Sequence, residues 1–483
     1  MILSLINNSY EYEMQKLCML FLPHEKIVTS AEAAEGEDRA IVAKELCGEK
    51  LRLWARLIIG DREFFEEETA DPALENEDKE LARRLAALLF ECFCQAFDRR
   101  PPWGILTGVR PAKLMSRLCA DMGEESAVDY FKNSLFVSDA KTELCLNTHK
   151  SEEKIISLSG KDSASLYISI PFCPTRCSYC SFVSHSVRNA GKLIDDYIAL
   201  LCREIAETGA IAKSIGLRIE SVYIGGGTPT ILSPEQIEMV TSAVAENFDL
   251  SNCREYTIEA GRPDTITLPK LLAIKQGGAD RICINPQTMN DDVLAEIGRK
   301  HSSNQTIEAF NLARQAGFSN INMDVIAGLP LDTFESFKDS LCRIAELDPE
   351  GITVHSLAMK RASELTARDY RSDIDADKMV DFAVRYLPEK GLNPYYMYRQ
   401  SKTVGNLENV GYSKAGFEGL YNVFIMDETH TILGCGASAV TKLRRFGEPT
   451  IERVFNFKYP YEYISRFEEM IARKKRIKEF YNE

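Results

Sequence analysis

The sequence predicts an α/β fold built on a parallel sheet, because short apolar segments alternate with longer amphipathic ones from about residue 165 onward. This alternation is typical of right-handed βαβ units, whose strands pair in parallel. Helix signals separate the segments: Ser233 precedes Pro234 as an N-cap does, and Gly317 follows an amphipathic stretch as a helix stop does. On this pattern, a partial (β/α)6 barrel and an open doubly wound sheet both remain possible. The predicted strands are 165–170, 219–226, 255–260, 281–285, 320–328 and 351–357.

A chain of 483 residues is too long for one compact domain. Residues 1–150 predict a small α+β domain, with a strand at 51–59, then a polar and acidic loop, then a helix at 76–97. The alternating unit is expected at 160–390. Residues 391–483 alternate less clearly and predict a C-terminal α+β extension, suited to cover a substrate.

Charge and hydropathy exclude some partners. The chain has 58 basic and 72 acidic side chains, a net charge of −14, which repels nucleic acid and anionic membranes. No apolar run approaches the ~18–20 residues that span a bilayer, and the N-terminus lacks a signal-peptide pattern. We therefore expect a cytoplasmic protein with no membrane insertion and no nucleic-acid partner. The basic run at 473–476 is typical of a solvated helix face.

Three of the fourteen cysteines form a cluster. Cys173, Cys177 and Cys180 are spaced C-x3-C-x2-C directly after the strand 165–170, at the strand end where parallel α/β folds carry their sites. Three thiolates this close can bind three irons of a [4Fe–4S] cluster and leave the fourth iron open to a small chelator. Arg176 lies inside the loop, where it could stabilise the anionic centre.

A zinc site is the alternative interpretation of the three cysteines. Structural zinc prefers four protein ligands, commonly from two C-x2-C pairs, and the sequence has no second pair with this spacing. His185 is the nearest candidate for a fourth ligand. The spacing and the position after a strand favour the iron–sulfur interpretation.

The cysteine loop resembles that of the radical S-adenosylmethionine (SAM) superfamily. YISIPFC at 167–173 and YCSF at 179–182 resemble the oxygen-independent coproporphyrinogen III oxidase-like family, and YIGGGTPT at 223–230 is similar to its glycine motif. The N-terminal TGVRP segment resembles the HemZ-type branch. The resemblance covers about 165–450 and favours a partial (β/α)6 radical SAM barrel over a doubly wound sheet.

The resemblance implies two cofactors, a [4Fe–4S] cluster on the three cysteines and SAM beside it. Glycine backbone can approach the amine and carboxylate of SAM because no side chain intervenes. Acidic side chains at strand ends suit the ribose hydroxyls or the cationic part of SAM, and an arginine suits its carboxylate. The residues that match the family's SAM contacts are Tyr167, Tyr179, Gly226, Gly227, Thr228, Glu259, Gln287, Arg299, Asp324, Ala358 and Val440.

The resemblance also implies an oxidoreductase of anaerobic haem biosynthesis. A low-potential electron donor reduces the cluster, SAM is cleaved to a 5′-deoxyadenosyl radical, and this radical abstracts hydrogen from the substrate. The tetrapyrrole coproporphyrinogen III would lose CO2 from two propionates, giving the vinyl groups of protoporphyrinogen IX. We expect no catalytic side chain beyond the cluster and SAM. Carboxylates and a macrocycle require basic and aromatic side chains, for which the candidates are Arg262, Lys360, Arg361, Arg399, Tyr395, Tyr396 and Tyr398.

One position departs from the oxidases, which carry a further cysteine two residues after the third cluster ligand. Here that residue is Phe182, as in the related haem chaperones, yet the segment NLENVGYSKAG lacks the histidine and tryptophan of the chaperones' HNxxYW-type motif. The oxidase function is favoured. A haem-binding, chaperone-like function and a SAM-dependent methyltransferase on the same scaffold remain open, and the sequence assigns no role to residues 1–150.

Overall fold

The computed structural model divides into two compact units, residues 1–147 and 148–483, and the division falls within helix α5 (Asp139–Ile156). Within the described part of the chain, no helix is long and apolar enough to cross a membrane. The side chain of Asn76 is not described. The structure describes residues 1–30, 37–182, 184–359, 363–367, 375–400, 403–448 and 450–482.

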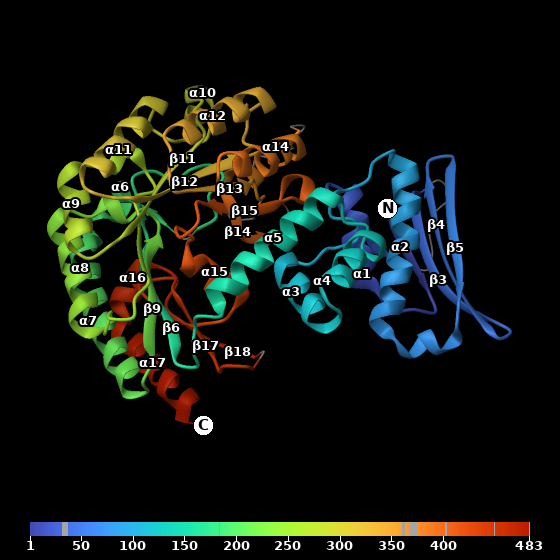
Figure 1. Cartoon of the computed structure of the whole chain (residues 1–483), viewed down its shortest axis with the longest axis horizontal. Coiled ribbons are helices and arrows are strands. Elements are labelled where there is room, and N and C mark those ends of the chain that lie inside the picture. The colour runs from blue at the N-terminus through green and yellow to red at the C-terminus, as the bar shows by residue number, and fades with distance from the viewer. Residues whose placement is uncertain are drawn as a thin grey trace. The chain divides into compact units, whose positions relative to one another are not determined.

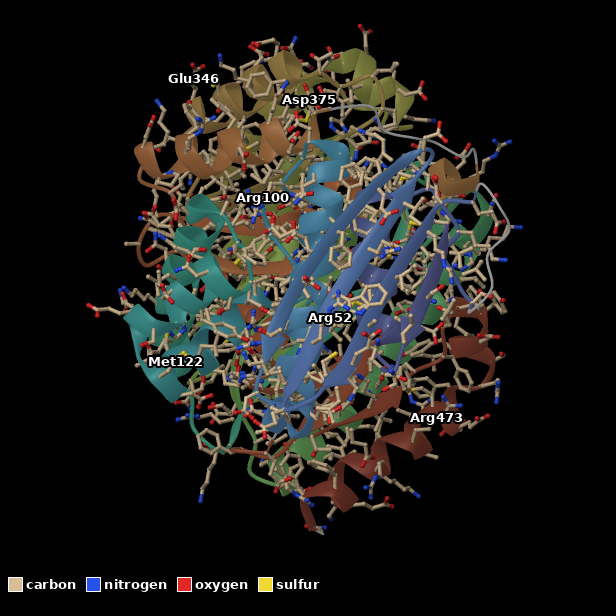
Figure 2. All side chains as sticks on the ribbon, turned by 90° about the vertical axis from the view of Figure 1, so that its right-hand side faces the viewer. Arg52, Arg100, Met122, Glu346, Asp375 and Arg473 are labelled. Carbon is tan, nitrogen blue, oxygen red and sulfur yellow. The ribbon has the colours of Figure 1, made fainter. Side chains whose placement is uncertain are left out.

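The first unit is an α+β domain, as predicted. Its described strands form one sheet in the order β2-β1-β3-β4-β5, and helix α2 packs on β4 and β5. Alternate residues of β4, such as Leu51 and Leu53, are buried against the helices, whereas Arg52 lies on the outer face of the sheet (Figure 2). The elements are β1 Ile2–Ile6, α1 Glu11–Phe21, β2 Val28–Thr29, β3 Arg39–Cys47, β4 Lys50–Ile59, β5 Arg62–Ala70, α2 Asp78–Phe97, α3 Pro111–Met122 and α4 Glu124–Asp129.

The prediction of an acidic loop after the strand 51–59 is wrong, because most of that segment forms β5. Strand β5 pairs with β4 in an antiparallel register along its whole length. Glu67 lies on the outer face of the sheet, where it forms an ion pair with Arg52 at 2.5 Å, whereas Glu66 and Glu68 face helix α2 and interact with its Gln95 and Arg84. The segment therefore has the acidic composition of a loop although it is a paired strand, with glutamates on both of its faces.

The second unit is built on one large sheet with order β14-β15-β13-β12-β11-β10-β9-β6-β16-β17-β18 among its described strands. The six predicted strands correspond to β6 and β9–β13, which pair in parallel in chain order. Because β14 and β18 lie at opposite ends of this order, the sheet is open and not closed into a barrel. The strands are β6 Ser163–Ile170, β7 Phe172–Cys173, β8 His185–Ser186, β9 Arg218–Gly226, β10 Glu255–Glu259, β11 Arg281–Gln287, β12 Asn320–Ala327, β13 Gly351–Ser356, β14 Asn393–Arg399, β15 Glu408–Ser413, β16 Thr431–Cys435, β17 Val440–Arg444 and β18 Ile451–Phe455.

Helices α7, α8, α9, α11 and α12 lie along one face of this sheet (Figure 1). The predicted cap of α8 is present, since Ser233 and Gln236 form a reciprocal capping box. The helices of the second unit that follow α5 are α6 Val187–Ala190, α7 Ile194–Ser214, α8 Pro234–Asn247, α9 Leu268–Gln276, α10 Asp291–Glu296, α11 Ser303–Gln315, α12 Phe334–Glu346, α13 Glu364–Ala367, α14 Ala376–Glu389, α15 Leu420–Asp427, α16 Pro460–Ser465 and α17 Phe467–Asn482.

A buried ion pair fixes the C-terminal helix α17 to α7. Lys474 and Glu204 are 1% and 0% exposed, and Nζ lies 2.9 Å from Oε1. The Tyr463 hydroxyl and the backbone N–H of Gly436 also donate to Glu204. The basic run 473–476 is therefore not a uniformly solvated face, because Lys474 turns inward from it.

We expect Lys474→Met to lower the free energy of unfolding by about 3–5 kcal/mol, because it leaves the Glu204 carboxylate buried without its cation. Chemical denaturation followed by circular dichroism measures this change. Adding Glu204→Gln should recover part of the loss, and Lys475→Met, at an exposed lysine of the same helix, should change little. Equal stability of the Lys474→Met and Lys475→Met variants would contradict this assignment.

Candidate functional site

The three-cysteine loop lies at the carboxyl end of β6 and is held by the glycine motif that follows β9. The N–H of Gly227 donates to Ile170 O at 2.7 Å, and the N–H of Thr228 donates to Phe172 O at 2.8 Å. A Cβ at Gly227 would lie 2.5 Å from Phe172 O, so only glycine permits this approach. The Thr228 hydroxyl lies 3.5 Å from Cys173 Sγ. The glycine motif thus supports the cysteine loop directly.

A cavity of about 390 Å³ opens at the carboxyl ends of the parallel strands. Cys173, Cys177 and Cys180 line it, and so do nine of the eleven predicted SAM contacts. The other two lie outside the lining: Tyr167 stacks behind it on Tyr223, and Val440 is on β17. The nine lining residues are Tyr179, Gly226, Gly227, Thr228, Glu259, Gln287, Arg299, Asp324 and Ala358.

Two carboxylates in the cavity have opposite protonation preferences. Burial raises the pKa of Glu259 to about 7, and Asp324 adds to this shift, while the Tyr223 hydroxyl donates to Glu259 and opposes it. Burial also disfavours ionised Asp324, but His355, together with hydrogen bonds from Thr353 and Asn322, holds the pKa of Asp324 below its usual value. His355 Nε2 lies 3.7 Å from Asp324 Oδ2. Perturbed neighbouring acids of this kind are typical of functional sites.

Arg299 brings a buried positive charge to the cavity. Its guanidinium donates to Asn285 O at 2.5 Å, to Gly261 O at 3.1 Å and to the Tyr179 hydroxyl at 3.2 Å. Among the described residues it forms no ion pair with a carboxylate. Within the described part of the chain, three buried polar atoms of the lining have no hydrogen-bond partner. They are Arg299 Nε, Gln287 Oε1 and Asn285 Oδ1. These residues fit a ligand that has a carboxylate together with amine or hydroxyl donors, as SAM has.

Gln287 has a left-handed backbone, with φ of 71°. A non-glycine residue in this conformation stores strain, and such strain is often found at ligand sites. The conformation occurs at the end of β11, where the pairing with β12 shifts register. The irregularity turns Gln287 into the cavity lining.

The cysteine loop fits a cluster better than a single metal ion. Within the described ranges, no three His, Cys, Asp or Glu side chains converge as one ion requires. A [4Fe–4S] cluster instead places each thiolate on a different iron, so its ligands spread around it. The ring of His185, the candidate fourth zinc ligand, packs edge-on against Tyr459 and Tyr461.

The predicted substrate contacts are dispersed. Arg262 lines the cavity but forms an ion pair with Asp264, and Arg399 is 3% exposed and donates to Asn406 O outside the lining. Lys360 and Arg361 lie outside the described residues. Tyr396 and Tyr398 line the cavity, Tyr395 packs beside Tyr396, and Phe182 is 69% exposed in the lining.

The sequence reasoning did not single out several lining residues. Asn322, His355 and Asn409 come from β12, β13 and β15, and Cys283 from β11. The signal that could have found His355 is its place at the carboxyl end of a predicted parallel strand. Asn409 carried no such signal, because it enters the cavity from an antiparallel strand that the alternation did not predict.

Comparisons with known proteins show the family to which the chain belongs. Residues 167–342 match the radical SAM superfamily. The chain is 39% identical to the oxygen-independent coproporphyrinogen-III oxidase-like protein HemZ of Bacillus subtilis over 76% of this chain and 75% of that protein. It is 36% identical to the haem chaperone HemW of the same organism over 41% of this chain and 51% of that one.

The solved structure of coproporphyrinogen III oxidase HemN from Escherichia coli shares the fold. Its TM-score is 0.52 at 24% identity, over 66% of this chain and 72% of that one. The chain therefore belongs to the radical SAM superfamily, within its HemN- and HemZ-like family. Membership implies a [4Fe–4S] cluster and SAM as cofactors.

We expect SAM binding to strengthen with pH through the ionisation of Glu259. With a pKa of about 7, roughly a tenth of this carboxyl is ionised at pH 6 and nine-tenths at pH 8. Because the carboxylate is the form that attracts SAM, its affinity should rise about tenfold over this interval. Calorimetry of the anaerobic, cluster-loaded protein at both pH values measures the change.

Glu259→Gln should bind SAM weakly and with little pH dependence. Glu246→Gln, at an exposed carboxylate of α8, should retain the tenfold change. Wild-type affinity that is the same at pH 6 and pH 8 would contradict the assigned role of Glu259.

Proposed function

We propose that this protein oxidatively decarboxylates coproporphyrinogen III to protoporphyrinogen IX, with the cluster on Cys173, Cys177 and Cys180. The observation that carries the proposal is a single cavity that contains the cysteine loop, nine predicted SAM contacts and the aromatic rings of Tyr396 and Tyr398. HemZ, which shares most of its length with this chain, is named as an oxidase-like protein.

The chain's own residues would position the cofactors and the substrate. Arg299 would bind the carboxylate of SAM, and the backbone of Gly226 and Gly227 would bind its polar amino-acid end. Glu259 and Asp324 would bind the ribose hydroxyls. When bound, the cluster and SAM supply a carbon radical that abstracts hydrogen from a propionate side chain.

The substrate would occupy the part of the cavity on the β13–β15 side. Tyr396, Tyr398 and Met426 offer apolar and aromatic surface to a macrocycle. His355 is a candidate cation for a propionate, because Asp324 raises the pKa of this imidazole even though burial opposes its charge. Lys360 and Arg361, which lie outside the described residues, remain proposed contacts from the sequence, as does Arg399.

Phe182 favours a second candidate, a haem-binding function like that of the chaperones. It replaces the additional cysteine of the oxidases, and its exposed ring lies in the cavity lining, where it could contact a planar macrocycle. The partial similarity to HemW is consistent with this candidate.

Anaerobic incubation with coproporphyrinogen III, SAM and a reductant distinguishes the two candidates. The oxidase function predicts protoporphyrinogen IX together with 5′-deoxyadenosine, both measured by chromatography. Formation of 5′-deoxyadenosine without vinyl product would refute the oxidase proposal. A stable Soret band on addition of haem, with no product, would support the haem-binding candidate instead.

The proposed cluster ligands are tested by single serine substitutions. Cys177→Ser should remove most of the bound iron and the absorbance of the [4Fe–4S] cluster after anaerobic reconstitution, because one iron loses its thiolate. Cys202→Ser, at a cysteine on α7 that does not line the cavity, should leave both unchanged. Full iron content in the Cys177→Ser variant would refute the ligand assignment.

A further inference from the structure

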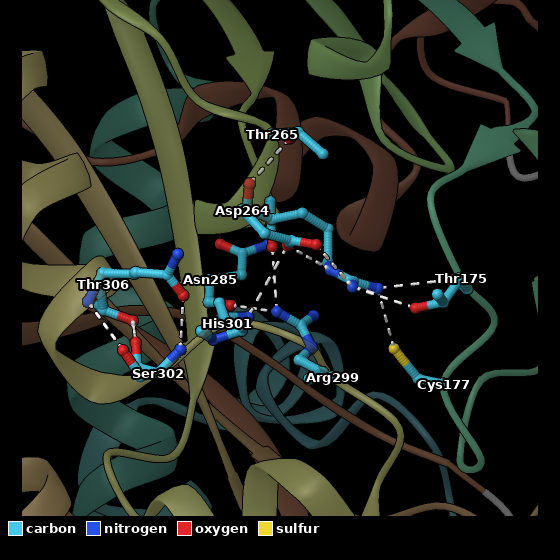
Figure 3. Close-up of polar contacts among 12 residues, drawn as sticks. Thr175, Cys177, Asp264, Thr265, Asn285, Arg299, His301, Ser302 and Thr306 are labelled. Atoms are coloured by element: carbon cyan, nitrogen blue, oxygen red, sulfur yellow. Dashed lines mark hydrogen bonds and ion pairs between the residues drawn. The ribbon is translucent and has the colours of Figure 1, made fainter.

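Arg262 lies in the segment that follows β10 and contacts the cysteine loop. It is 3% exposed, and its Nη1 donates to Cys177 Sγ at 3.6 Å and to Thr175 O at 3.4 Å. Its Nη2 donates to the Thr175 hydroxyl at 3.1 Å. Figure 3 shows these contacts as dashed lines that end at Thr175 and at Cys177. The guanidinium therefore joins two residues of the loop, one of them a proposed iron ligand.

Asp264 holds this guanidinium in place. Its two carboxylate oxygens accept from Nε and Nη2 of Arg262 at 3.1 and 3.2 Å. A forked pair of this kind fixes the plane of the guanidinium as well as its position. Nη1 remains directed at the sulfur, because Nε and Nη2 are occupied by the carboxylate.

His301, the other ionisable side chain beside Asp264, does not neutralise the charge of this carboxylate. His301 Nδ1 lies 3.9 Å from Asp264 Oδ1, and the side chain of His301 is fully buried. Burial lowers the pKa of His301 to about 3, so its imidazole is neutral near pH 7. The negative charge of Asp264 is therefore balanced by Arg262, and Arg299, which also interacts with Cys177, adds a further positive charge beside the sulfur.

We infer that Arg262 is a positioning residue of the iron–sulfur cluster and not a substrate contact: its N–H group donates to the Cys177 sulfur and raises the reduction potential, while Asp264 limits that rise. A hydrogen bond to a cluster sulfur stabilises the more negative, reduced state. The opposing carboxylate moderates the effect, because charges interact strongly in a buried, low-dielectric site. The inference rests on the proposed assignment of Cys177 as an iron ligand.

The pair predicts potential shifts of opposite sign. Asp264→Asn retains the guanidinium and removes its counter-charge, so the reduction potential should rise. The double variant Arg262→Met/Asp264→Asn removes both charges and the hydrogen bond, so the potential should fall below that of the wild type. For each variant we expect about a tenfold change in the reduction equilibrium constant, which is 59 mV for a one-electron couple.

The measurement is a potentiometric titration of the anaerobically reconstituted full-length protein, followed by electron paramagnetic resonance. Iron content and circular dichroism are recorded for each variant. Arg188→Met is the matched control, since Arg188 is an exposed arginine on α6, shortly after the cysteine loop, and its potential should match the wild type. If the double variant fails to bind four irons, the Asp264→Asn single variant still shows whether removal of the carboxylate raises the reduction potential.

Two results would overturn the inference. The first is an Asp264→Asn potential that is equal to or lower than that of the wild type. The second is a fully loaded double variant with an unchanged potential and a raised KM, which would make Arg262 a substrate contact. Neither affects the proposed function, which fails separately if anaerobic incubation with coproporphyrinogen III gives no vinyl product.

Discussion

The close approach of two backbone segments is the constraint on which the site depends. The glycine motif after β9 and the cysteine loop after β6 come from adjacent parallel strands, whose register pairs Ile170 with Gly226. Past the ends of these strands, Gly227 lies so near Phe172 O that a Cβ could not fit between them. The same contact that orders the cysteines also brings the glycine backbone to the cavity lining. The proposed positions of the cluster and of SAM are thus coupled through the main chain.

Charge is distributed unevenly around this contact. On the cysteine side, Arg299 and Arg262 are buried cations, and only Arg262 has a carboxylate partner among the described residues. On the far side, Glu259, Asp324 and His355 form an acid–base group at the ends of β10, β12 and β13. A zwitterionic ligand with a carboxylate at one end and a sulfonium nearer the other matches this polarity.

The parallel core and most of the site were predictable because both follow from short-range rules. Apolar strands in alternation with helices must pair in order, so residues at their carboxyl ends must converge on one edge. Glu259, Gln287 and Asp324 meet for this reason. Strand β5 was not predictable, because its glutamates lie on both faces, and those on the inner face find their polar partners on helix α2.

The sequence also did not predict where long charged side chains point. The basic run 473–476 does not reveal that Lys474 turns inward to Glu204, because the two residues are far apart in the sequence. The direction of the Arg262 side chain was likewise not predictable from the sequence. As a basic residue beside a predicted strand end it suggests a substrate contact, and only tertiary structure shows its guanidinium directed at Cys177. Long side chains reach several ångströms from their backbone, so sequence position locates their charge poorly.

The C-terminal segment brings the proposed cofactor contacts and the proposed substrate contacts to one cavity. Its strands β14 and β15 extend the sheet beyond β13, while β16, β17 and β18 extend it beyond β6. Tyr396, Tyr398 and Asn409 consequently line the same cavity as Cys173, although more than 200 residues separate them in the chain. A radical generated at one end of an open parallel sheet needs a substrate within reach and little water, and continuation of that sheet by antiparallel strands provides a wall beside it. The proposed substrate contacts Tyr396 and Tyr398 therefore lie on the same sheet as the proposed cofactor contacts Glu259 and Asp324.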